Sequence, residues 1–103
     1  MVIAGAYAKK LRRTLFAQLR DAIKDGSVTN QEVARAAAEM NQILYQILID
    51  DLGLDKGDVV RIVVDYDVDG GKVVWKLDTL TIEAFKRVPD EEVSKVIRDR
   101  VAA

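Results

Sequence analysis

The spacing of apolar residues near the start of the chain predicts two helices. Leucine and alanine recur every three or four positions between residues 7 and 24, the repeat of a helix with one apolar face. We expect this first helix to end at Gly26, because glycine readily leaves the helical conformation. Thr29 and Glu32 then form a capping box, a sequence signal that starts a second helix. That helix is expected to run to about Leu52.

The second half of this second helix differs from an ordinary surface helix. Residues 43–49 are apolar on nearly every side, interrupted only by Gln46. A helix that is apolar all round is either surrounded by the core or covered by another subunit. The residues alone leave both alternatives open.

Beyond residue 58, apolar and polar residues alternate one by one, which predicts strands. We expect a hairpin turn at Asp69-Gly70-Gly71 and a shorter turn at Asp78-Thr79. Residues 2–6 are a candidate edge strand. Strands are therefore predicted over residues 60–68, 73–77 and 80–86.

The alternation places Tyr66 and Trp75 on the apolar face of this sheet. A two-residue hairpin loop would pair Val64 with Trp75, and a four-residue loop would pair Tyr66 with Trp75. Both registers give the same face, so packing in the core is the favoured role of both rings. A tryptophan at a cleft between sheet and helix can still offer one edge to a ligand.

A last helix is expected to start near Pro89, with acidic residues 90–92 at its positive end. Its apolar stripe consists of Val93, Val96, Ile97 and Val101. The order of elements predicts a single α+β domain over residues 1–103. In this domain two N-terminal helices pack on an antiparallel sheet of three to four strands, and a C-terminal helix follows.

The composition argues against an enzyme. The chain contains neither cysteine nor histidine, which excludes disulfides, thiol nucleophiles and imidazole bases. The sequence Asp65-Tyr-Asp67-Val-Asp69-Gly70 resembles the start of a calcium loop, but Lys76 stands where that loop needs a glutamate. We therefore expect neither a metal nor a cofactor.

No segment of the sequence predicts export or membrane insertion. The first residues lack a basic leader, and the longest apolar stretch is too short to cross a bilayer. The expectation is a soluble, cytoplasmic protein with no membrane partner. The absence of cysteine together with abundant Val, Ile, Lys and Glu is typical of hosts that grow at high temperature.

Charge is unevenly distributed along the chain. The net charge is −1, yet residues 1–24 contain six Lys or Arg and a single Asp, a local charge of +5. On a helical wheel these cations form a row together with an aromatic ring. Cations neutralise phosphates and a ring stacks on a base, which is the chemistry of a sequence-tolerant single-strand site. The row consists of Lys9, Arg13, Phe16, Arg20 and Lys24, bordered by Lys10 and Arg12.

The triplet Phe85-Lys86-Arg87 repeats this chemistry at the end of the last predicted strand. Two plainer interpretations stay open. Phe16 borders the apolar face of its helix and would then belong to the core, and a basic helix face is commonly just solvated. An oligomeric scaffold that binds another protein is thus an alternative to a nucleic-acid binder.

Four segments of the chain resemble the archaeal ThermoDBP-related proteins, a family that includes non-canonical single-stranded DNA-binding proteins of hyperthermophiles. The segments are GAYAKKLRRTLFA at 5–17, ARAAAEMNQILY at 34–45, LGLDKGDVVRI at 52–62 and FKRVPDEEV at 85–93. The resemblance implies a cleft of aromatic and basic residues that holds single-stranded DNA without sequence preference. By this resemblance, the residues expected to contribute to the cleft are Arg12, Arg13, Phe16, Phe85, Lys86 and Arg87.

Larger members of this family append a coiled-coil zipper, and no heptads follow the last predicted helix here. The resemblance therefore implies the short form, in which subunits associate through the shared domain, and residues 43–49 are the candidate contact. We expect a homo-oligomer, a dimer or tetramer, that binds single-stranded DNA or RNA. The expected site residues are Lys9, Arg12, Arg13, Phe16, Arg20, Phe85, Lys86 and Arg87.

Overall fold

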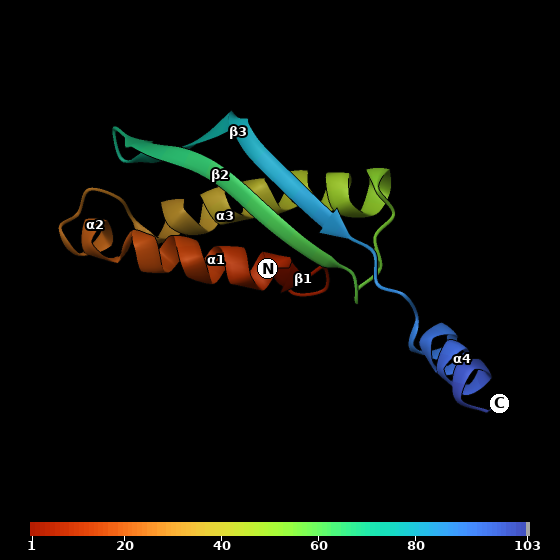
Figure 1. Cartoon of the computed structure of the whole chain (residues 1–103). Coiled ribbons are helices and arrows are strands. Elements are labelled where there is room, and N and C mark those ends of the chain that lie inside the picture. Colours follow the sequence, from red (N-terminus) through yellow and green to blue (C-terminus); the bar gives the residue numbers. More distant parts are fainter. Residues whose placement is uncertain (103) are drawn as a thin grey trace.

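The computed structural model describes residues 1–102 and has the expected α+β architecture (Figure 1). Its three strands form one antiparallel sheet in the order β1-β2-β3. α1 and α3 lie beneath the sheet, and α4 stands apart at the C-terminal end. The elements are β1 (Val2–Ile3), α1 (Tyr7–Gln18), α2 (Arg20–Lys24), α3 (Asn30–Tyr45), the π-helix η1 (Gln46–Asp51), β2 (Val59–Asp69), β3 (Lys72–Phe85) and α4 (Asp90–Val101).

The prediction of one unbroken helix over residues 7–24 was wrong at Leu19. This residue has φ −98° and ψ 8° and separates α1 from α2. Its side chain is buried beside Leu15 and Val33, while Ile23 of α2 packs against the same cluster. We infer that packing against α3 causes the break, because both helical segments turn their apolar residues toward one cluster.

The start of the second helix at Thr29 is confirmed, but only half of the predicted capping box forms, because the Glu32 carboxylate bonds Arg35 and Val73. The Thr29 hydroxyl accepts the backbone N–H of Glu32 at 3.1 Å at the start of α3. The helix continues beyond Tyr45 as the π-helix η1. Leu44 and Leu48 are completely buried, so the inner side of residues 43–49 belongs to the core. Only the outer side of this stretch, where Tyr45 is 53% exposed, is accessible to another subunit.

The hairpin pairs Tyr66 with Trp75, in agreement with one of the two registers considered. The prediction of separate strands before and after Asp78 was wrong, because β3 continues through this turn along the same partner strand. The register shifts opposite Val64, where Thr79 forms an irregularity. Its hydroxyl accepts the N–H of Asp65 at 2.8 Å and donates to the Lys76 carbonyl at 2.6 Å. These bonds keep the extra residues attached to the sheet.

The core consists of two clusters between the helices and the sheet. One lies under β1 and the start of β2, and the other lies under the hairpin. The first contains Ala4, Tyr7, Met40, Leu44, Leu48, Leu54 and Val60. The second contains Leu15, Leu19, Val28, Val33, Ala36, Ala37 and Val73.

A buried carboxylate joins the two ends of the hairpin. Asp58 is 4% exposed and accepts the backbone N–H groups of Arg87 at 2.7 Å and Asp55 at 2.8 Å. These two bonds, the one from Arg87 foremost, hold the pKa of Asp58 below its ordinary value. The Arg87 guanidinium in turn bonds Asp90 at the start of α4. This chain of contacts anchors the segment that leads out to α4.

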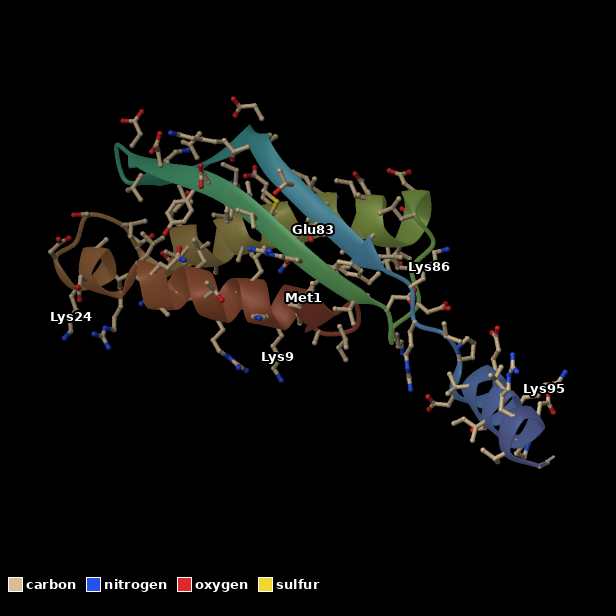
Figure 2. The ribbon with its side chains drawn as sticks, in the orientation of Figure 1. Met1, Lys9, Lys24, Glu83, Lys86 and Lys95 are labelled. Carbon is tan, nitrogen blue, oxygen red and sulfur yellow. The ribbon has the colours of Figure 1, made fainter. Side chains whose placement is uncertain are left out.

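The C-terminal helix leaves its apolar stripe uncovered. Val93, Val96, Ile97 and Val101 are 43%, 55%, 54% and 76% exposed. In Figure 2 the helix, marked by Lys95, lies away from the rest of the molecule. None of its residues in the described part of the chain is buried.

No helix within residues 1–102 has both the length and the apolar character needed to span a bilayer.

Candidate nucleic-acid interface

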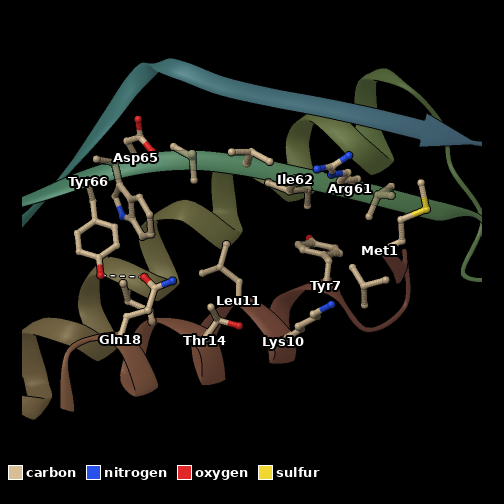
Figure 3. Close-up of a pocket in the computed structure, with 16 residues that line it drawn as sticks. Met1, Tyr7, Lys10, Leu11, Thr14, Gln18, Arg61, Ile62, Asp65 and Tyr66 are labelled. Atoms are coloured by element: carbon tan, nitrogen blue, oxygen red, sulfur yellow. Dashed lines mark hydrogen bonds between the residues drawn. The ribbon is translucent and has the colours of Figure 1, made fainter.

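A groove with a volume of about 520 Å³ lies between α1 and β2 (Figure 3). Consecutive residues 60–66 of β2 form one wall, and one side of α1 forms the other. Trp75 of β3 and the first two residues of the chain complete it. The α1 residues that line it are Tyr7, Lys10, Leu11, Thr14, Leu15 and Gln18.

Two aromatic rings are fixed at one end of this groove. Tyr66 and Trp75 pack edge to face, with centroids 5.5 Å apart and planes at 72°. The Trp75 indole N–H donates to the Ala36 carbonyl at 2.8 Å, which ties β3 to α3. The Tyr66 hydroxyl donates to Oε1 of Gln18 at 2.9 Å, which ties β2 to α1 (Figure 3). Burial raises the pKa of Tyr66, so this hydroxyl keeps its proton at neutral pH.

A third ring and two cations lie toward the other end. Tyr7 is buried. This burial raises its pKa, and the nearby Tyr45 raises it further by a smaller amount. Lys10 and Arg61 belong to the lining residues, and Figure 3 shows both near Tyr7. Arg61 also approaches Glu83 at 3.9 Å, across exposed surface. Within residues 1–102 Lys10 has no ion-pair partner. The groove therefore combines flat apolar surface with positive charge.

None of the eight predicted site residues lines the groove. Lys9, Arg12, Arg13 and Arg20 are exposed. At 100° per residue, Lys9, Arg12 and Arg13 are centred on the side of α1 opposite the groove-lining residues, whereas Arg20 follows the break at Leu19 and belongs to α2. Figure 2 accordingly shows Lys9 pointing away from the sheet.

Phe16 is neither sealed in the core nor open to solvent. It is half-buried against the second core cluster, and the Arg12 guanidinium lies 5.3 Å from its ring centre. A cation over a ring stabilises the pair modestly at a surface. One side of the ring is therefore already occupied by protein.

The second predicted group lies at the far end of the sheet. Phe85 is 45% exposed at the end of β3. Lys86 follows it directly in the chain and is labelled in Figure 2. Arg87 is engaged with Asp58 through its backbone and with Asp90 through its side chain. Within residues 1–102, no hydrogen bond or ion pair joins these three residues to the basic row of α1.

The residues of the calcium-like sequence have other contacts. Asp67 pairs with Lys76 at 3.2 Å, and the backbone N–H of Asp65 bonds Thr79. Within residues 1–102 no three carboxylates are grouped in a way that could hold a metal ion.

Sequence reasoning missed Tyr7, Arg61 and Gln18 as lining residues and treated Lys10 as a border. It placed Tyr66 and Trp75 correctly on the apolar face of the sheet, where both are partly buried. One signal was present in the sequence: Tyr7, Lys10, Thr14 and Gln18 follow helical spacing and mix polar with apolar groups.

Comparison with known proteins identifies close structural relatives. The crystal structure of apeThermo-DBP-RP2 bound to ssDNA dT10 is 47% identical in sequence, with a TM-score of 0.90 over 99% of this chain and 47% of that chain. The crystal structure of pfuThermo-DBP-RP1 (crystal form II) is 41% identical, with a TM-score of 0.75 over 95% of this chain and 63% of that one. The chain thus spans about half to two thirds of the length of these relatives.

No curated protein sequence matches the chain significantly. The model of the family described as ThermoDBP-related, archaea, matches residues 1–74, which is most of the chain. Three of the four segments that carry the resemblance lie within this match, and the fourth, at residues 85–93, lies outside it. The chain belongs to the archaeal ThermoDBP-related family.

Proposed function

We propose that this chain is a non-enzymatic protein that binds single-stranded DNA, without sequence preference, in the groove between α1 and β2. The observation that carries the proposal is the groove itself, which joins the rings of Tyr7, Tyr66 and Trp75 to the cations Lys10 and Arg61. Rings stack on any base, and cations neutralise any phosphate. The relative with a TM-score of 0.90 carries ssDNA dT10 in its crystal structure, which supports the same ligand class here.

The predicted basic residues then have a second role. The outer row of α1 lies across a helix about 10 Å wide, comparable with the screening length in physiological salt. Its charge therefore raises the positive potential around the groove and attracts phosphates of a strand that extends beyond it. We assign this role to Lys9, Arg12 and Arg13 of α1, to Arg20 at the start of α2, and to Lys86 and Arg87 after β3. Phe85, which is uncharged and 45% exposed, offers a further ring on which a base can stack.

Fluorescence anisotropy with labelled dT10 tests the proposal directly. Affinity should fall as salt rises, with a log–log slope of about −0.7 for each phosphate contacted. Duplex DNA of the same length should bind more weakly, since its bases are stacked and paired. An RNA oligonucleotide measured in parallel shows whether the protein prefers DNA or RNA. Absence of dT10 binding at low salt would overturn the proposal.

Two neighbouring lysines allow the groove and the outer face of α1 to be tested separately. Lys10→Ala should weaken dT10 binding and reduce the salt slope by about 0.7, because one phosphate contact is lost. Lys9→Ala removes the same charge from the outer face, about 100° around the helix from Lys10, and should have a smaller effect on both quantities. Equal effects of the two variants in the same salt series would contradict the placement of the phosphates in the groove.

We further propose that the chain associates with a second copy through α4. An isolated helix of only 12 residues is marginally stable in water, so its uncovered apolar stripe needs a partner. The charges of α4 favour an antiparallel arrangement. Residues 90–92 are acidic, whereas Arg98 and Arg100 lie in the last turn. Antiparallel pairing places opposite charges together, and parallel pairing places like charges together.

Sedimentation of the intact chain over a range of concentrations tests this association. Ile97→Asp should shift the equilibrium strongly toward the monomer, because it places a charge in the apolar stripe. Lys95→Asp places the same residue on the opposite side of α4 and serves as the matched control. A monomer at all concentrations for the natural sequence, or equal effects of both variants, would refute the role of α4.

A further inference from the structure

The strand edge that faces the groove has no partner strand over most of its length. β2 lies between β1 and β3, but β1 pairs only with Val59 and Val60. From Arg61 onward, β2 is therefore bordered on this side by the groove. This explains why consecutive residues 60–66 line it, since a ligand there meets the edge of the strand as well as its side chains.

The hydrogen-bond pattern identifies which main-chain groups point into the groove. The N–H of Ala4 donates to the carbonyl of Asp58 at 2.7 Å, so the main-chain groups of even-numbered residues at the start of β2 point toward β1. The N–H of Asp65 instead donates to Thr79 of β3. Residues two apart in a strand direct these groups to the same side. Ile62 and Val64 therefore direct N–H and C=O toward the groove.

No strand within the described residues 1–102 takes up these groups of Ile62 and Val64. In an extended strand the N–H and C=O of one residue point the same way, so each of these residues presents a donor beside an acceptor. Every nucleobase carries the complementary combination, a donor next to an acceptor, on the edge that it uses in base pairing. Ile62 and Val64 also contribute half-buried apolar side chains, which shield such bonds from water.

We propose that the unpaired edge of β2 binds the Watson–Crick edges of unpaired bases through the main-chain groups of Ile62 and Val64. This inference rests on the proposed function and adds the basis of its selectivity. A duplex has no such edges available, so it is excluded by chemistry and not only by size. Because the protein contributes one donor and one acceptor at each position, all four bases satisfy it, and recognition does not depend on sequence.

A modified ligand tests the inference on the intact protein. Ten residues of N3-methylthymidine have the phosphates and rings of dT10 but lack the N3–H donor, and the methyl group blocks the pairing edge. We expect this oligonucleotide to bind at least about 10-fold more weakly than dT10, with the same salt slope. Equal affinity of the two would overturn the inference and leave the proposed function intact. Failure of dT10 itself to bind would instead overturn the proposed function.

A matched pair of backbone variants tests the protein side. Replacement of Val64 by its α-hydroxy acid changes one amide to an ester, which removes the N–H of Val64 and weakens the Val63 carbonyl as an acceptor. We expect dT10 affinity to fall roughly 2- to 12-fold, the range for one net hydrogen bond. The same replacement at Val68, which has the same side chain and orientation but lies outside the groove lining, should leave affinity unchanged. Unchanged affinity for the Val64 ester, in a variant that melts like the Val68 ester, would contradict the inference.

Discussion

Replacing Tyr66 with leucine should weaken dT10 binding by about 5- to 150-fold. Stacking of one base on an aromatic side chain contributes about 1–3 kcal/mol, and leucine retains apolar volume without a flat ring. The ring is accessible from the groove and held in position by Trp75 and Gln18. The salt dependence should stay the same, because no charge is removed. Anisotropy titrations at three salt concentrations measure both quantities.

The matched control is Tyr66→Phe, which keeps the ring and loses only the hydroxyl bond to Gln18. Its affinity should stay close to that of the natural sequence. Thermal melting of both variants separates a loss of stacking from a loss of folding, since Tyr66 also packs against the second core cluster. If the leucine variant folds and binds dT10 as tightly as the natural sequence, the ring does not contact bases.

Glu32→Ala should lower the free energy of unfolding at pH 7 by about 2–3 kcal/mol. The Glu32 carboxylate accepts Nε and Nη2 of Arg35 at 2.6 and 2.7 Å and the backbone N–H of Val73 at 2.8 Å. Val73 is 2% exposed, so the substitution leaves a buried donor without a partner. Arg35 also donates to the Val73 carbonyl at 3.2 Å. The pair thus attaches the start of α3 to β3. Urea unfolding measures the effect.

The same carboxylate makes part of the stability depend on pH. The hydrogen bond from Arg35 lowers the pKa of Glu32 most, and the bond from the N–H of Val73 adds to this effect. Together they lower the pKa from 4.5 to about 2. A depressed pKa stabilises the fold fully above pH 4.5, and this contribution is lost as the pH falls toward 2. The difference between the natural sequence and Glu32→Ala should therefore shrink over this interval.

Glu39→Ala is the control for this experiment, because Glu39 reaches only Nη1 of Arg35, at 3.4 Å on exposed surface. It should change stability by less than about 0.5 kcal/mol. A Glu32→Ala effect that is as large at pH 2.5 as at pH 7 would show that packing, and not the charged contact, is responsible.

The parts of the fold that were predictable from the sequence depend on neighbours along the chain. The Thr29 cap and the alternation of β2 follow from local residue patterns. The edge strand predicted over residues 2–6 forms only at Val2–Ile3. The break at Leu19 and the irregularity at Thr79 do not follow from local patterns, because each is stabilised by contacts with a distant element. Leu19 packs against α3, and Thr79 bonds Asp65 across the hairpin.

The candidate groove was harder to predict for a geometric reason. A helical wheel identifies the most charged side of α1, and that side points to solvent. The groove lies between α1 and β2, which are about 40 residues apart in sequence, so its lining includes the mixed side of the helix. The unpaired edge at Ile62 is even less visible in the sequence, because it results from the shortness of β1.

The bonds from Trp75 to Ala36 and from Tyr66 to Gln18 fix both rings before any ligand arrives. Immobilising a side chain during association typically costs about 0.5–1.5 kcal/mol, and this entropic penalty grows with absolute temperature. A preorganised receptor has already lost that freedom in the act of folding. Its affinity should consequently decline less on heating than that of a receptor that must order itself around its ligand.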